Sequence, residues 1–133
     1  MKIRSTPTII VNLFLFLLFA LTTEVAADSM KIAVATTGPE KDAAISQQAA
    51  RAPFFLFFND KGNFLEAVEN PSRDRSRNAG PNAALFLADK GVTLVIAGNI
   101  GNKMGQALRD DQIEYIEKTG VGYDVVQTTI QDR

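Results

Sequence analysis

The stretch "GPNAALFLADKGVTLVIAGNIG", residues 80–101, contains the pattern of a helix, a glycine stop and a buried strand in succession. Pro81 suits the first turn of a helix, and the alanine- and leucine-rich run that follows ends at Gly91, a residue type favoured just past a helix C-terminus. Residues 92–98 are almost continuously apolar, as in a parallel strand covered on both faces. This order predicts an α/β domain, in which the helix turns these residues inward: Ala84, Leu85, Leu87 and Ala88.

The chain before this stretch has the pattern of three strands. Residues 31–36 (KIAVAT) form an apolar first strand that Gly38 and Pro39 end. Residues 54–60 form an aromatic strand, and residues 64–70 alternate as a half-exposed partner strand. Gly62 in the "DKGN" turn between them supplies the positive φ that a tight hairpin requires. We therefore expect an antiparallel hairpin over residues 54–70.

The chain after this stretch continues the α/β pattern. A second helix is expected from about residue 102 to 110, a short strand around Glu114 and a last helix within residues 123–132. Together these elements predict a mixed five-stranded sheet with helices on its faces. It combines an N-terminal strand and antiparallel hairpin with a parallel βαβ half.

Residues 1–27 have the order of a secretory signal peptide. Lys2 and Arg4 precede an apolar run over residues 9–21, and small residues allow cleavage after Ala27. We expect export to the periplasm or the exterior, with residues 28–133 as a single domain that has no membrane segment. The alternatives are a retained N-terminal anchor and translation that begins at Met30.

The sequence contains neither histidine nor cysteine. This excludes Ser-His-Asp triads, Cys-His dyads, thiolate-held iron–sulfur clusters and the ordinary zinc and copper sites. Residues 28–133 retain 12 basic and 14 acidic residues once Lys2, Arg4 and Glu24 are removed, a net charge of −2. That balance offers no general attraction for nucleic acid. We expect a protein that is not an enzyme, with neither catalytic residues nor metal-ligating side chains.

Two glycine-containing turns are candidate ligand-binding segments, because ligands of open α/β sheets bind beyond the C-terminal ends of parallel strands. The first turn is Thr36, Thr37 and Gly38. The second is Gly98, Asn99, Ile100, Gly101 and Asn102, which leads directly into a helix N-terminus. Backbone N–H groups at such an end favour an anion. The alternative interpretation of the second turn is a plain strand-to-helix connection.

Arginines provide a second set of candidate binding residues. Arg73, Arg75 and Arg77 alternate in a loop that leads to Gly80 and the N-terminus of the first helix, and Arg51 precedes the aromatic strand. Guanidinium groups beside free helix N–H groups suit an oxyanion or a negatively charged cluster. The alternative is a solvated surface loop.

Four segments of the chain resemble one known family. "MKIAVAT", "ISQQAARAPFFLFF", "VENP" and "AGPNAALFLADKGVTLVIAGNIGNKMGQAL", within about residues 31–118, are similar to the dinitrogenase iron–molybdenum cofactor biosynthesis family. The family includes NifX- and NafY-type carriers and the C-terminal domain of NifB. The resemblance implies a ribonuclease H-like three-layer α/β fold without nuclease activity. It also implies a role in binding or carrying iron–sulfur or molybdenum cofactor precursors.

The sequence departs from the family at one motif. Many members carry a His-Phe-Gly-Arg-Ala motif after the first strand, whose histidine is a candidate cluster ligand. Residues 48–52 here read Gln-Ala-Ala-Arg-Ala, so Arg51 is kept and Gln48 takes the ligand position. The resemblance thus implies a molybdenum or iron–sulfur cluster, or an oxyanion, held without His or Cys.

Two functions remain open from the sequence. One is an exported carrier of a small anionic ligand or metal cluster. The other is a protein-interaction module or homodimer that has kept the fold and lost the cofactor. The second would use aromatic surface of the hairpin, from Phe54, Phe55, Phe57 and Phe58.

Overall fold

The computed structural model of the protein describes residues 29–133, and the expected leader over residues 1–27 lies outside the described residues. Five strands and three helices follow one another along this part of the chain. Their bounds are β1 Ile32–Thr36, β2 Phe54–Phe58, β3 Phe64–Glu69, α2 Ala79–Asp89, β4 Leu94–Ala97, α3 Asn102–Asp110, β5 Glu114–Glu117 and α4 Gly122–Gln131.

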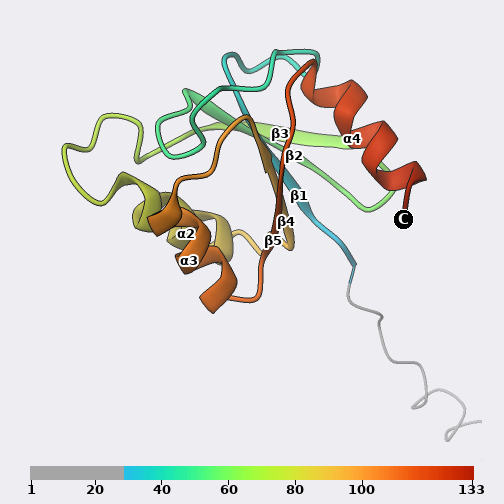
Figure 1. Ribbon diagram of the computed structural model, residues 1–133. Coiled ribbons are helices and arrows are strands. Elements are labelled where there is room, and N and C mark those ends of the chain that lie inside the picture. The colour runs from blue at the N-terminus through green and yellow to red at the C-terminus, as the bar shows by residue number, and fades with distance from the viewer. Residues whose placement is uncertain (1–28) are drawn as a thin grey trace, which may run out of the picture.

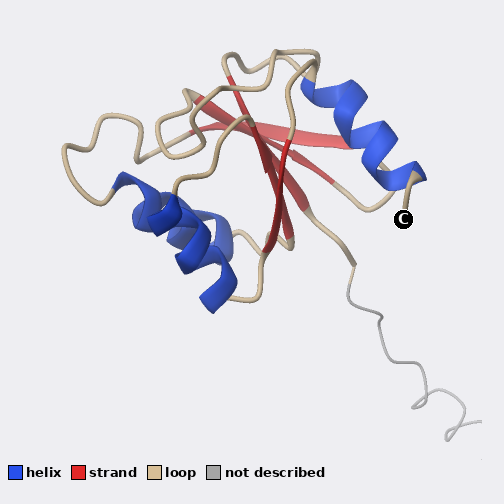
Figure 2. Ribbon diagram, in the orientation of Figure 1, coloured by secondary structure: helices blue, strands red, loops and turns tan. Residues whose placement is uncertain are grey.

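The strands form one mixed sheet in the order β3-β2-β1-β4-β5. β2 runs antiparallel to β1 and β3, whereas β1, β4 and β5 are mutually parallel. α2 and α3 lie together on one face of the sheet, and α4 lies on the other (Figures 1 and 2). The predicted fold class, a three-layer α/β domain with a mixed five-stranded sheet, is confirmed.

The aromatic strand β2 is covered on both faces. Phe55 and Phe57 have no exposed area and belong to the core that α2 and α3 cover. Leu56 and Phe58, equally buried, belong to the core on the α4 side. Phe54 is half-buried. The aromatic surface that the interaction-module hypothesis required is therefore not exposed on this strand.

Two details of side-chain orientation differ from the sequence expectation. Helix α2 begins at Ala79, two residues before Pro81, and Leu85 is 57% exposed rather than inward. In β3 the strict alternation is broken by an irregularity opposite Phe57 and Phe58. Phe64 consequently packs against Phe58 on the α4 side, with a ring separation of 5.6 Å.

Two predicted glycine turns are confirmed. Gly62 in the hairpin turn has φ +83°, and Gly91 after α2 has φ +77°, conformations that other residues adopt only with strain.

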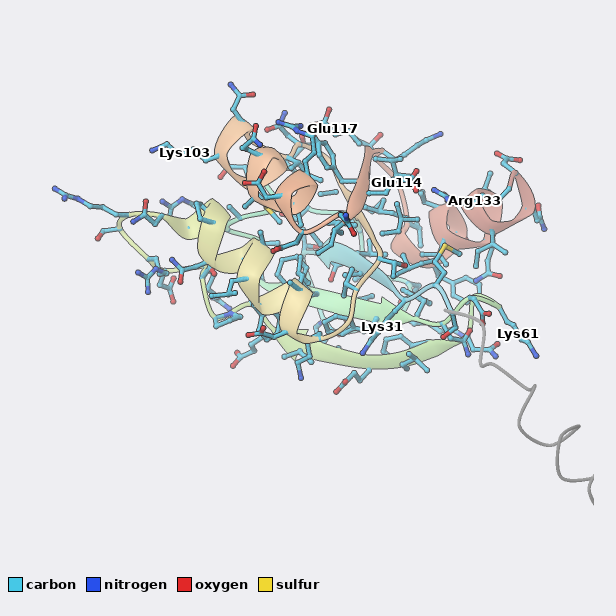
Figure 3. The ribbon with its side chains drawn as sticks, turned by 90° about the horizontal axis from the view of Figure 1, so that it is seen from below. Lys31, Lys61, Lys103, Glu114, Glu117 and Arg133 are labelled. Carbon is cyan, nitrogen blue, oxygen red and sulfur yellow. The ribbon has the colours of Figure 1, made fainter. Side chains whose placement is uncertain are left out.

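At the C-terminus, Arg133 donates to the Glu114 carboxylate at 2.7 Å (Figure 3), and this bond raises the pKa of the guanidinium. Within residues 29–133, no helix has the length and apolar character needed to cross a bilayer.

Candidate anion-binding site

A segment of the chain itself covers the ends of the parallel strands β1 and β4. The N–H of Ser46 donates to the carbonyl of Ala35 at 2.8 Å, and the N–H of Gly98 donates to the carbonyl of Ser46 at 2.9 Å. The N–H of Ala49 in turn donates to the carbonyl of Asn99 at 3.0 Å. Residues 44–49 therefore lie across the edge of the sheet where a ligand is expected in an open α/β fold.

The first candidate turn uses its polar groups internally. Thr36 is buried, and its hydroxyl donates to the carbonyl of Gly38 at 2.8 Å. The N–H of Thr37 donates to the carbonyl of Ala44 at 3.0 Å. These bonds fix the turn against residues 44–49 and leave it outside the pocket described below.

The first part of the second turn is also held by the chain. A Cβ atom added to Gly98 would lie 2.8 Å from the Ser46 carbonyl oxygen and 2.9 Å from the Cα of Gln47. The N–H of Ile100 donates to the Glu117 carboxylate at 2.8 Å, so a side chain of β5 takes one of the N–H groups expected to meet an anion (Figure 3).

A pocket of about 300 Å³ opens between the N-terminal ends of α2 and α3. Four of the candidate residues line it: Arg51, Gly80, Gly101 and Asn102. The other nine do not: Thr36, Thr37, Gly38, Arg73, Arg75, Arg77, Gly98, Asn99 and Ile100. The full lining is Ala50, Arg51, Asn78, Ala79, Gly80, Pro81, Gly101, Asn102, Lys103 and Met104.

Both helices point uncapped N-terminal ends at this pocket. α2 follows Asn78, which adopts a left-handed conformation with φ +57°, and α3 follows Gly101; neither residue provides a capping side chain. The first N–H groups of a helix have no acceptor within the helix, and the helix dipole makes this end partly positive. The first turns of α2 and α3, which the structure describes completely, contain no acidic residue. The pocket therefore presents positive potential from two backbone ends.

The close approach of the two helices depends on Gly80. A Cβ atom added there would lie 3.1 Å from both the Cβ and the backbone nitrogen of Met104 in α3. Because no side chain separates them at this point, the two helix ends share one pocket.

Arg51 and Lys103 add formal positive charge to the lining. The Arg51 Nη1 donates to the carbonyl of Arg75 at 2.6 Å, which orients the guanidinium and uses one of its five N–H donors. Lys103 is an exposed residue of the first turn of α3 (Figure 3). Sequence reasoning did not select Lys103 or Asn78. The feature of the sequence that could have identified both residues is their position next to the expected helix starts.

The donors of the pocket fit an anion rather than a bare metal ion. The sequence contains no His or Cys, and no group of three or more His, Cys, Asp or Glu residues suited to a metal ion occurs within residues 29–133. N–H groups, a guanidinium and an ammonium instead suit oxo or sulfido atoms at the outside of a metal species. The thioether of the buried Met104 is the one soft atom in the lining.

A second hollow of about 320 Å³ lies along α4 and the turn before it. Its lining includes Lys118 but also Asp124 and Asp132, and it contains none of the candidate residues. Carboxylates beside the lysine make this hollow a poorer place for an anion than the pocket between α2 and α3.

Comparison with known proteins identifies the family. A family model described as dinitrogenase iron-molybdenum cofactor matches residues 30–132. The chain is similar to the apo form of the orange protein from Desulfovibrio gigas, with 29% identity, a TM-score of 0.73, and coverage of 80% of this chain and 92% of that one. It is also similar to a putative NifB protein from Thermotoga, with 25% identity, a TM-score of 0.66, and coverage of 78% and 90%. Among curated proteins, none matches the chain significantly. The chain belongs to the dinitrogenase iron-molybdenum cofactor family.

Proposed function

We propose that the protein is a non-enzymatic carrier that binds a small anionic metal species in the pocket between α2 and α3. The cargo is an oxo or sulfido anion of molybdenum, or an iron–sulfur or molybdenum cofactor precursor. Membership of the family supports this class of cargo. The observation that carries the proposal is the convergence of two uncapped helix N-termini and Arg51 on one pocket of about 300 Å³.

The pocket holds the cargo through its outer atoms. Hydrogen bonds that involve an ionised partner contribute about 1.5–3 kcal/mol each, and the N–H groups at the two helix ends and Arg51 supply several. Most of the pocket surface is apolar, from residues that include Ala79, Pro81 and the buried Met104, and this lowers the local dielectric constant and strengthens these interactions. The volume equals that of about ten water molecules at ~30 Å³ each, which suits a small anion or one edge of a larger cluster.

The ionisable side chains of the pocket lining are Arg51 and Lys103, whose positive charge serves the proposed carrier role by attracting the anionic cargo. Binding through N–H and guanidinium groups forms hydrogen bonds but no covalent bond. The cargo can therefore be released without breaking a covalent bond to the protein.

The carrier proposal includes export. It rests on the tripartite order of residues 1–27, with cleavage expected after Ala27. Intact-mass measurement on protein recovered from the periplasm of the source cells tests this point. We expect the measured mass to equal that of residues 28–133, with Asp28 as the first residue. A mass that includes residues 1–27 contradicts cleavage.

Binding of molybdate and tetrathiomolybdate tests the carrier function, because they are simple oxo and sulfido anions of molybdenum. We expect calorimetric titration to show binding that weakens as salt is added. Arg51→Gln is expected to weaken it about tenfold, the equivalent of ~1.4 kcal/mol. The matched control is Lys61→Gln, which removes one cation in the hairpin turn between β2 and β3 (Figure 3).

The two variants decide the location of the site. Reduced affinity in Arg51→Gln with unchanged affinity in Lys61→Gln supports the pocket. Equal affinity of Arg51→Gln and the unmodified protein for both anions removes Arg51 from the site and contradicts the proposed function.

A further inference from the structure

The loop over residues 70–78 carries arginines that the anion pocket does not use. Arg73, Arg75 and Arg77 are exposed, and none of them lines the pocket between α2 and α3. Arg75 and Arg77 instead line a separate hollow of about 270 Å³, and Arg73 lines another of about 540 Å³. Their guanidinium groups are therefore available while the pocket is occupied.

The backbone of this loop is held by hydrogen bonds of buried residues. Asn70 and Ser72 are each only 1% exposed. The Asn70 side chain donates to the carbonyl of Ala50 at 2.9 Å and accepts from the N–H of Ser72 at 2.9 Å. The carbonyl of Arg75 accepts the bond from Arg51. The loop that carries the arginines is therefore anchored to the protein by buried hydrogen bonds. In this respect it differs from the plain solvated loop that was the alternative interpretation of the sequence.

The loop carries an excess of positive charge. Residues 70–78 contain three arginines and one aspartate, a local charge of +2, whereas residues 28–133 together carry −2. Two further carboxylates lie near the loop: Glu69 lines the same hollow as Arg73, and Asp89 lines the same hollow as Arg75. The one ion pair of the loop among residues 29–133 joins Arg73 and Asp74 at 3.8 Å, with the Asp74 side chain 91% exposed. Such an exposed pair is weak. Arg75 Nε donates only to the carbonyl of Arg77, at 3.3 Å.

An exposed apolar side chain lies beside one of these arginines, Arg75. Leu85 of α2 is 57% exposed, the largest fraction among the exposed large hydrophobic residues of the described chain. It lines a hollow of about 250 Å³ together with Arg75 and the half-buried Phe86. Arginine and aromatic residues are both enriched at the centre of protein–protein interfaces, and Arg75 and Phe86 lie together in this hollow.

We propose that Arg73, Arg75, Arg77 and Leu85, here called the arginine face, dock a protein partner whose contact surface combines carboxylates with an apolar side chain. Guanidinium groups bind carboxylates in paired geometry. The exposed Leu85, which lines the same hollow as Arg75, favours a protein surface over a run of phosphates. The inference that this partner delivers or receives the cargo rests on the proposed function, but the docking itself does not.

The position of the face supports a link to the pocket. Arg77 is followed directly by Asn78, which lines the pocket, and Arg51 contacts both the pocket and the loop. A partner seated on the arginine face would therefore lie next to the bound anion.

Fluorescence anisotropy with a labelled peptide of alternating glutamate and leucine tests the docking, using protein expressed from the full chain. We expect saturable binding that falls about tenfold in the triple variant Arg73→Gln, Arg75→Gln, Arg77→Gln, because three weak, exposed guanidinium–carboxylate pairs are lost together. Leu85→Gln is expected to lower it about threefold. The matched control removes three cations elsewhere, as Lys41→Gln, Lys61→Gln, Lys118→Gln, and is expected to retain binding within twofold.

Several results overturn the docking proposal: absence of peptide binding to the unmodified protein, an equal loss in the control triple variant, or tighter binding of a single-stranded oligonucleotide of the same charge. Tetrathiomolybdate titration of the arginine triple variant separates the two proposals. Unchanged anion affinity supports distinct sites, whereas its loss assigns the arginines to the cargo pocket and overturns the docking. If the unmodified protein binds the peptide but neither molybdenum anion, the proposed function fails and the docking stands.

Discussion

Two glycines in the turn after β4, three residues apart, have different surroundings. Gly98 lies beneath the segment over residues 44–49, where an added Cβ would meet backbone atoms of Ser46 and Gln47 at 2.8–2.9 Å. Gly101 has nothing within 4 Å of the same position and lines the anion pocket. The first glycine is required by the chain's own packing, and the second leaves room for a ligand. A glycine-rich turn is therefore not a binding loop along its whole length.

The same contrast separates the two regions that the sequence suggested as one site. The ends of β1 and β4 are covered by residues 44–49, and the N–H groups of Thr37, Gly98 and Ile100 are bonded within the protein. The ends of α2 and α3 have no capping side chains and face a pocket. Substitutions at the covered strand ends should therefore change mainly stability, whereas substitutions at the helix ends should change mainly anion binding.

Gly98→Ala is expected to have the largest effect on stability. The added methyl group meets backbone atoms that cannot rotate away, and overpacking of this kind costs typically 1–3 kcal/mol; we expect about 3 kcal/mol in the free energy of unfolding. Urea denaturation followed by circular dichroism measures it. A loss below ~0.5 kcal/mol, within the range of ordinary surface substitutions, would show that residues 44–49 do not hold the turn as described.

Gly80→Ala is expected to have an intermediate effect on stability and a clear effect on binding. The new methyl group would lie 3.1 Å from Met104, so the ends of α2 and α3 must shift by a few tenths of an ångström to accommodate it. Improved helix propensity offsets part of the cost, and we expect a net loss of about 1 kcal/mol. Because the helix ends that hold the anion are displaced and the methyl group narrows the pocket, tetrathiomolybdate affinity should fall by about tenfold. Calorimetric titration that shows unchanged affinity would mean that the helix ends act independently.

Gly101→Ala is the matched control for Gly98→Ala and is expected to change stability least. Its φ of −62° and ψ of 164° are accessible to alanine, and the position is open. We expect a loss below about 1 kcal/mol, since glycine has only a modest advantage over alanine before a helix. Gly101→Leu extends the series: it should leave urea denaturation similar to that of Gly101→Ala but obstruct anion binding. Full binding by Gly101→Leu would contradict the position of the site.

Local sequence patterns were sufficient for the elements of the fold. The apolar runs of β1 and β4, and the turn glycines Gly62 and Gly91, each fix structure through neighbours in the sequence. Leu85 was placed wrongly because, at about 100° per residue, it lies on the opposite side of α2 from the buried stripe. The inward face of α2 is Ala79, Ala83, Ala84 and Leu87.

The candidate site was only partly accessible from the sequence. The covering of β1 and β4 by residues 44–49 depends on backbone bonds between distant segments, such as that between Ser46 and Gly98, which leave no local pattern. Arg51 reaches the loop over residues 70–78 through a similarly distant bond. The helix ends, in contrast, were correctly located at Asn102 and close to Gly80, and these are the parts of the site that the pocket brings together.

Nuclear magnetic resonance of ¹⁵N-labelled protein titrated with tetrathiomolybdate tests the location of the site most directly. Each backbone N–H reports separately, so the two regions are compared in one experiment. We expect the largest shifts at residues 79–80 and 101–104, the N-terminal ends of α2 and α3, with the amides of residues 36–38 and Gly98 unchanged. Shifts concentrated at residues 36–38 and Gly98, or along α4, would contradict an anion site between α2 and α3.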